Sequence, residues 1–198
     1  PILVNDELIV YAGSTLYRIN KDTGETIKTG KMAGSSSFSI NGPTYADGMI
    51  FVALTNGVVQ AFDADSLESL WIYHDPLKGQ PNCPITVSNG YAYTGFWNSE
   101  TGDASFVCIP IADERPTASN EEKYAAWRHV QAGGFYWAGA CVQNGVLLVG
   151  TDDGQDSTSP VLSTGRVLLF DAATGALLDE VGGICGDVRS TICYDSGS

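Results

Sequence analysis

The chain has 198 residues, 43% of them hydrophobic, which is enough for one well-buried domain. Acidic side chains outnumber basic ones, 23 against 10, and the formal net charge is −13. Because phosphate groups are bound by clustered Lys and Arg, this balance argues against nucleic acid and against an anionic membrane surface as partners.

The apolar segments are all short. None approaches the roughly 18–20 residues of a membrane span, so no membrane insertion is expected. No signal peptide is visible, because the sequence opens directly on the apolar residues 1–4, and we interpret this start as a mature or trimmed terminus.

A polar turn that opens a short apolar run recurs along the chain. The turns stand at Asp47-Gly48, Asn89-Gly90 and Asn144-Gly145, with a weaker copy at Asp6-Glu7. They lie 41, 42 and 55 residues apart, and such recurrence is the signature of a repeat architecture. The predicted repeats cover about 1–41, 42–82, 83–136 and 137–186, and a fifth begins over 187–198.

The second repeat shows the expected unit most clearly. Apolar and β-branched runs at 43–46, 49–54, 58–62 and 70–73 are separated by polar turns, including the hairpin signal Asn56-Gly57. Four short antiparallel strands joined in this way form one blade of a β-propeller. The predicted fold is therefore an all-β propeller of four-stranded antiparallel blades in a single domain or domain fragment.

The third repeat departs from this pattern through an inserted segment, residues 112–124. Within it, Ser119 and Glu122 match the S-x-x-E capping pattern of a helix start. The pattern predicts a helix of at most one or two turns, the only one expected in the chain.

The turn after the third strand carries a shared motif in the first, second and fourth repeats, whereas in the third repeat the inserted segment takes its place. Residues 61–71 read AFDADSLESLW, residues 169–175 read LFDAATG, and residues 19–24 are similar with Asn20 in the Asp position. These segments resemble the A-x-D-x-x-T-G-x-x-x-W repeat of PQQ-type (quinoprotein) β-propellers. The resemblance implies turn-forming roles for Asp63, Asp171, Thr23, Thr174, Gly24 and Gly175, and packing between blades for Trp71 and Trp127.

The family that these repeats resemble contains PQQ-dependent alcohol dehydrogenases and cofactor-free scaffolds, such as the lipoprotein propeller of outer-membrane protein assembly. The dehydrogenases have adjacent cysteines beside the quinone and a calcium site near a catalytic Asp. No two cysteines are adjacent here, and no stretch matches a calcium–quinone pocket. The resemblance therefore favours the cofactor-free branch, with no cofactor and an extracytoplasmic location.

The number of first strands bears on the size of the ring. Five are expected, beginning near residues 1, 43, 84, 138 and 188, against four sets of the other three strands. This count favours part of a larger ring of seven or eight blades. Two alternatives remain open, a homodimer that joins two half-rings and a closed ring of four blades.

Enlarged loops indicate where a ligand site would lie. Loops at 97–103 and 151–165 and the link at 133–139 are expected to share one rim of the propeller. Their aromatic side chains predict a surface that binds a protein, a peptide or a glycan: Trp97, Phe135, Tyr136 and Trp137. The alternative is that these rings pack between blades.

The remaining polar residues give weaker signals. Asp152, Asp153 and Asp156 are candidate calcium ligands, against the alternative of a solvated acidic turn. The histidines are expected to be structural, and no hydrolase, zinc-protease or phosphate-loop motif is present. The five cysteines are interpreted as small buried hydrophobic residues, with a disulfide or metal site as the alternative: Cys83, Cys108, Cys141, Cys185 and Cys193.

The sequence thus predicts a non-catalytic scaffold or binding module that uses its rim loops. The alternative is an enzyme, either a PQQ-dependent dehydrogenase or a hydrolase, with its site on the rim or in the central channel. No catalytic residue can be assigned from the sequence.

Overall fold

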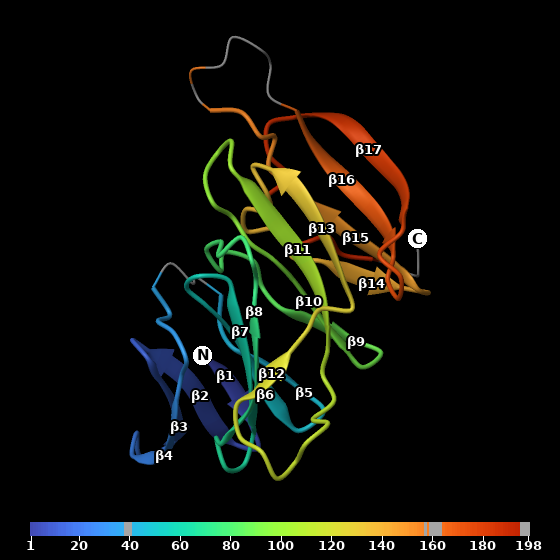
Figure 1. Cartoon of the computed structure of the whole chain (residues 1–198). Helices are drawn as coiled ribbons and strands as arrows, with labels where there is room; N and C mark the ends of the chain where they lie inside the picture. Colours follow the sequence, from blue (N-terminus) through green and yellow to red (C-terminus); the bar gives the residue numbers. More distant parts are fainter. Residues whose placement is uncertain (38–40, 157, 159–163, 195–198) are drawn as a thin grey trace.

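The computed structural model describes residues 1–37, 41–156, 158 and 164–194. Over these residues the chain is all-β, with four sheets that succeed one another from the blue N-terminal sheet to the orange C-terminal sheet (Figure 1). In that part of the chain, no helix has the length and apolar character needed to cross a membrane.

The first two sheets are built from consecutive strands. The first contains β1 (Ile2–Val4), β2 (Glu7–Ala12), β3 (Thr15–Asn20) and β4 (Thr26–Lys31). The second contains β5 (Thr44–Ala46), β6 (Met49–Leu54), β7 (Val58–Asp63) and β8 (Ser69–His74). Neighbours in the order of the chain pair antiparallel, as the alternation of apolar runs and turns predicts.

The last two sheets repeat this order. The third contains β9 (Thr86–Ser88), β10 (Tyr91–Gly95), β11 (Asp103–Pro110) and β13 (Trp127–Ala132). The fourth contains β14 (Cys141–Gln143), β15 (Val146–Gly150), β16 (Thr164–Asp171) and β17 (Leu177–Cys185). The prediction of four-stranded antiparallel sheets is confirmed.

The turn between the first and second strands has the same backbone in every sheet. Both central residues have positive φ, for example 50° and 75° at Asp47 and Gly48, and 50° and 79° at Asn89 and Gly90. This is the two-residue turn that suits the twist of a hairpin, and Asn, Asp and Gly are the residues that tolerate it. In the first sheet the turn is Asn5-Asp6, with φ of 48° and 64°, so the predicted Asp6-Glu7 was one residue too late.

In the first, second and fourth sheets, the turn between the third and fourth strands is held by one side-chain oxygen. The Oδ1 atoms of Asn20, Asp63 and Asp171 each accept hydrogen bonds from the backbone N–H groups two and three residues later. Although burial acts to raise the pKa of Asp63, the hydrogen bonds from Ser66 and Asp65 outweigh it and hold this pKa below its ordinary value. The predicted turn-forming role of these residues is confirmed.

Three apolar cores lie in the seams between successive sheets. In two seams a Trp from the fourth strand of one sheet donates its indole N–H to the carbonyl of the residue just after the third strand of the next sheet. Trp71 donates to Ile111 at 3.0 Å, and Trp127 donates to Ala172 at 2.9 Å. The predicted packing of both Trp residues between sheets is confirmed.

The inserted segment does not form the predicted helix. Its residues Glu121–Lys123 form β12, which pairs parallel to β8 and adds a fifth strand to the second sheet. The capping pattern reports only local hydrogen bonds, whereas the open edge of β8 offers a row of backbone partners that a one-turn helix cannot use. Pairing leaves the side chains of Glu121 and Lys123 buried, and Lys123 donates to the carbonyl of Ala112.

The segment after β17 runs back along the fourth sheet. The backbone N–H of Val188 donates to the carbonyl of Thr151, and that of Ile192 donates to Gly139. Residues 187–194 form no strand, and residues 195–198 lie outside the described part of the chain. The first strand of a fifth repeat therefore stays a prediction.

The cysteines only partly follow the expectation of small buried residues. Cys83 and Cys108 are fully buried, and burial raises the pKa of each thiol to about 12. Cys141 is half-buried, whereas Cys185 and Cys193 are exposed, so the expectation was wrong for these last two. All five are free thiols.

Candidate functional site

Loops after second strands and links between sheets meet at one rim of the molecule, which we call the link rim. Residue 97, after β10, pairs with Gln80 in the preceding link. The N–H of Phe135 donates to the carbonyl of Phe96, and the N–H of Asp152 donates to the carbonyl of Gly134. The predicted shared rim is therefore present, although residues 157 and 159–163 of the 151–165 loop lie outside the described residues.

Three aromatic rings lie side by side on the link rim and form a cluster that we call the aromatic platform. The ring centres of Trp97 and Tyr136 lie 5.0 Å apart, and Tyr136 stacks on Trp137 at 4.4 Å. The guanidinium of Arg189 lies 4.6 Å from the Tyr136 ring centre and 5.5 Å from that of Trp137. Both distances are within the range of cation–π attraction.

Arg189 was not predicted from the sequence. It follows β17, about fifty residues after the rings that it covers, and no spacing rule connects the two segments. The only local signal was its place in the link that begins the expected fifth repeat.

Phe135 does not take part in this surface. Its side chain is fully buried in the seam between the third and fourth sheets, 5.1 Å from the ring of Phe106. Of the four aromatic candidates, the structure brings together Trp97, Tyr136 and Trp137, and places Phe135 in the core.

Two features of the platform are unusual for residues that serve only packing. Trp137 has φ of 64°, a left-handed conformation that is rare for a bulky residue, and its side chain is 39% exposed. The indole Nε1 of Trp97 is buried and has no hydrogen-bond partner among the described residues. Strained backbone and unpaired polar groups are concentrated at functional sites.

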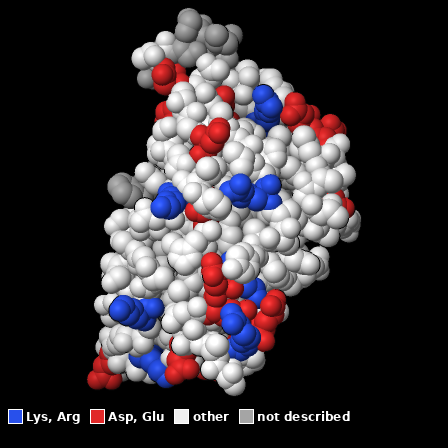
Figure 2. All heavy atoms as spheres, in the orientation of Figure 1, with Lys and Arg blue, Asp and Glu red and all other residues white. Residues whose placement is uncertain are grey.

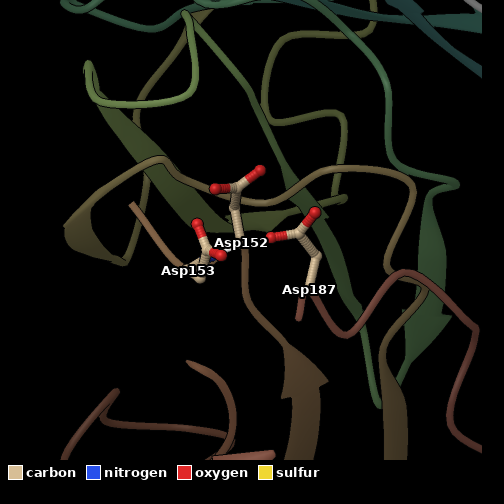
Figure 3. A group of neighbouring side chains, drawn as sticks. All are labelled: Asp152, Asp153 and Asp187. Atoms are coloured by element: carbon tan, nitrogen blue, oxygen red, sulfur yellow. Dashed lines mark hydrogen bonds between the residues drawn. The ribbon is translucent and has the colours of Figure 1, made fainter. Parts of the chain in front are cut away.

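An acidic group lies next to the platform. Ligand oxygens of Asp152, Asp153 and Asp187 all lie within 4.8 Å of one another, and Figure 3 shows the carboxylates of Asp153 and Asp187 on either side of that of Asp152. Asp156, the third candidate from the sequence, is outside this group and accepts hydrogen bonds from Thr158. Asp187 replaces it because the segment after β17 returns to the loop that follows β15.

Asp152 has the most perturbed environment of the three. The pKa of Asp152 is raised to about 6, mainly because the carboxylate is buried. The hydrogen bond from the N–H of Gly154 lowers this pKa, whereas the negative charges of Asp187, Glu100 and Asp153 raise it. The acidic group and the platform are connected, because Asp187 forms an ion pair with Arg189.

Two grooves lie away from the link rim, between outer strands. A groove of about 790 Å³ runs between β4 and the 116–120 segment, and its polar lining includes Lys28, Lys31 and Glu68. A smaller groove of about 360 Å³ lies beside β12 and includes Tyr73 and His74. No platform residue lines either groove.

The charged side chains on one face are mixed. On the face drawn in Figure 2, the Lys and Arg groups are separated from one another, and Asp and Glu groups lie beside several of them. This distribution differs from the continuous basic stripe that tracks a phosphate backbone.

The described residues do not form the quinone site of the dehydrogenases that the repeats resemble. The five thiols are all free, and Cys83 is fully buried with its Sγ 2.9 Å from the carbonyl oxygen of Phe135. Adjacent cysteines beside a quinone have no counterpart among these thiols, so no reaction step through a quinone is derived.

The repeats identify the family. A family model described as outer membrane protein assembly factor BamB matches residues 1–107, more than half of the 198 residues. The chain belongs to the PQQ-like β-propeller repeat family. No curated protein matches the sequence significantly.

Solved structures share the fold of this PQQ-like chain. The quinohemoprotein alcohol dehydrogenase of Comamonas testosteroni matches with a TM-score of 0.71 and 17% identity, over 94% of this chain and 35% of that one. A europium-containing methanol dehydrogenase matches with a TM-score of 0.64 and 13% identity, over 89% and 40%. BamB from Moraxella catarrhalis matches with a TM-score of 0.51 and 13% identity, over 89% and 58%.

These likenesses show the fold of the PQQ-like chain, a β-propeller whose blades are the four sheets described above. At 13–17% identity they carry no activity with them. The chain spans 35–58% of the length of these three proteins.

Proposed function

We propose that the chain is a non-catalytic propeller module that binds a protein, a peptide or a glycan through the aromatic platform on its link rim. The observation that supports this most strongly is the cluster of Trp97, Tyr136 and Trp137, in which the Arg189 guanidinium lies over the last two rings. Trp, Tyr and Arg are enriched among the residues that dominate binding energy at protein interfaces, and Trp and Tyr offer large contact areas with only two rotatable side-chain bonds. A flat aromatic face also suits the apolar face of a sugar ring.

A protein partner has additional support from the family. The matching family model is described as an outer membrane protein assembly factor, and assembly factors act on other proteins. We also propose an extracytoplasmic location on the same ground. Fractionation of source cells that finds the full-length protein in the cytoplasm would contradict the location without affecting the binding proposal.

The binding proposal is tested with peptide and glycan arrays probed by the purified chain. We expect Trp137→Ala and Arg189→Ala to lose at least ten-fold in affinity for any ligand found. Tyr124→Ala is the matched control, because this aromatic side chain is 71% exposed but lies beside β12, away from the platform. Equal loss in the control, or ligands whose affinity does not change in the platform variants, would contradict the proposal.

The alternative is an enzyme of quinoprotein type or a hydrolase. Its support is the fold shared with the two dehydrogenases. The test is an activity assay with the purified chain. Alcohol oxidation that depends on added PQQ, or ester hydrolysis, would favour the enzyme if the rate rose in proportion to the concentration of the chain.

We further propose that the four blades belong to a larger ring of seven or eight. The outer strand β17 is exposed along nearly its whole length, including Leu177, Leu178 and Val181, and the chain spans little more than a third of the dehydrogenase. Mass measurement in solution tests the size of the ring. A dimer of this chain would support the joining of two half-rings. A monomer in which β17 is protected from hydrogen exchange would favour a closed ring of four blades.

A further inference from the structure

Carboxylates from two distant segments converge on the link rim of the fourth blade. Asp152 and Asp153 follow β15, and Asp187 follows β17. Their ligand oxygens lie within 4.8 Å of one another (Figure 3), although 34 residues separate Asp153 from Asp187. Like charges at this separation repel, so the arrangement needs compensation.

An independent sign of a ligand comes from the innermost of the three residues. Asp152 is only 1% exposed, and its Oδ2 atom is buried without a hydrogen-bond partner among the described residues. Its Oδ1 atom accepts the N–H of Gly154 at 3.0 Å. An unpaired carboxylate oxygen out of contact with water is unfavourable, and a bound cation would supply the missing partner.

The backbone around the acidic group holds these residues in place. The N–H of Asp152 donates to Gly134, and the side chain of Gln131 donates to the carbonyl of Asp152. The N–H of Asp153 donates to Oδ1 of Asp187 at 3.1 Å, which joins the two segments directly. A Cβ on Gly133 would lie 2.5 Å from Oδ1 of Asp152, so only glycine lets the link approach this closely.

The protein compensates only part of the charge of the acidic group. Arg189 forms an ion pair with Asp187 through Oδ2 of that carboxylate. Three carboxylates and one guanidinium leave a net charge of about −2 when all are ionised, and the nearby Glu100 adds to the negative field at Asp152. A divalent cation matches the charge that remains.

We propose that Asp152, Asp153 and Asp187 bind a divalent cation that ties the loop after β15 to the segment after β17. Ligands that are all carboxylate oxygens select hard cations. Oxygens on opposite sides of Ca²⁺ are at most about 5 Å apart, whereas around Mg²⁺ they are at most about 4 Å apart. Carboxylate oxygens within 4.8 Å of one another can share one ion, and Ca²⁺, which accepts a flexible set of oxygens where Mg²⁺ demands a near-ideal octahedron, is the ion that we expect.

The test is calorimetric titration of the full chain, freed of metal with EDTA, with calcium chloride and separately with magnesium chloride. We expect one equivalent of Ca²⁺ to bind, with weaker binding of Mg²⁺ and a melting temperature that rises with the Ca²⁺ concentration. Asp152→Asn and Asp187→Asn should each lower the affinity for Ca²⁺ at least ten-fold.

The matched control is Asp156→Asn, which removes the same charge from the same loop but lies outside the acidic group. It should keep the wild-type affinity for Ca²⁺. Asp152→Asn should in addition raise the melting temperature of the metal-free chain, because it removes a buried charge that lies beside two other carboxylates and has one oxygen without a hydrogen-bond partner among the described residues. This opposite effect on the metal-free and Ca²⁺-loaded protein distinguishes a ligand from a residue needed only for folding.

Three results would overturn the proposal. The first is the absence of binding heat and of a Ca²⁺-dependent melting shift at millimolar calcium. The second is an equal loss of affinity in Asp156→Asn and Asp152→Asn, which would indicate nonspecific attraction to an acidic surface. The third is unchanged affinity in Asp187→Asn, since the site requires the segment after β17 to supply a ligand.

Discussion

The seams between blades and the link rim use the same residue types in different ways. In the seams, Trp71 and Trp127 are bonded through their indole N–H groups to the next blade. On the rim, the indole N–H of Trp97 has no partner among the described residues, and Trp137 is partly exposed with a left-handed backbone. Rings at positions that recur with the repeat support the fold, whereas the rings in the lengthened loops form the surface through which we propose that a ligand binds.

The largest expected effect tests the seam. Trp71 is fully buried, so Trp71→Ala should lower the free energy of unfolding by about 3–5 kcal/mol, because it removes an aromatic ring from a closed core. Trp71→Phe keeps one aromatic ring in the seam and loses the rest of the indole and the hydrogen bond to Ile111, so its loss should be smaller, about 1–3 kcal/mol. Thermal or denaturant unfolding measures both, and a near-neutral Trp71→Ala would show that the seam does not depend on this ring.

A pair of glycines separates turn strain from seam packing. Gly24 and Gly175 occupy the same place in their turns, with φ of 75° and 72°. A Cβ on Gly24 would meet no atom within 4 Å, whereas one on Gly175 would lie 2.5 Å from the ring of Trp127. Gly24→Ala should cost about 1 kcal/mol for the positive φ, and Gly175→Ala about 1–3 kcal/mol more for the clash in the seam.

The difference in unfolding free energy between Gly24→Ala and Gly175→Ala tests the rigidity of the seam. Equal unfolding free energies for the two variants would mean that Trp127 moves aside without cost. That result would contradict a rigid seam between the third and fourth blades.

Substitutions on the rim should have smaller effects on folding. Trp97→Ala and Tyr136→Ala should each lower the free energy of unfolding by no more than about 1 kcal/mol, since half-buried loop residues contribute little to a core. Their melting curves should stay close to that of the wild type. A loss comparable to that of Trp71→Ala would assign these rings to packing between blades and would remove the basis for the binding surface.

The smallest effect concerns pH and a half-buried ring in the seam. Burial lowers the pKa of His129, whose ring lies 5.0 Å from that of Phe170, although a hydrogen bond with Gln131 opposes this shift. The pKa of His129 is therefore lower in the folded chain than in the unfolded chain, where it is about 6.5. Stability falls as the pH drops from the unfolded pKa to the folded pKa, because only the unfolded chain binds the proton in that range.

The wild type should therefore lose more in melting temperature between pH 7.5 and 5.5 than His129→Gln, which cannot titrate. The carboxylates titrate in both proteins, so the difference between the two curves isolates His129. Parallel curves would show that the imidazole is as well solvated in the folded chain as in the unfolded chain.

Sequence patterns predicted the repeating parts of the molecule well. Turns such as Asp47-Gly48 and the Asp63 turn are specified by a few adjacent residues, because their backbone angles and hydrogen bonds are local. The packing of Trp71 and Trp127 also followed from the recurring motif. The error at the first turn was a single residue, because Asn5-Asp6 lacks the glycine that marks the other copies.

The site was predicted only in part. Trp97, Tyr136 and Trp137 were identified by their place in long loops and a link, but nothing local distinguished them from Phe135, which the fold turns into the core. Arg189 and Asp187 were missed because the segment that carries them reaches the site only through the return of the chain after β17.

The sequence alone determined the class of fold, the unit of repetition and the family, since each depends on short-range patterns that recur along the chain. Tertiary structure decided which polar and aromatic side chains meet. Residues 121–123 pair with β8, and Asp187 approaches the buried Asp152. Both contacts are made between segments that lie tens of residues apart in the sequence. Such contacts depend on how blades stack and links return, and adjacent residues do not encode that geometry.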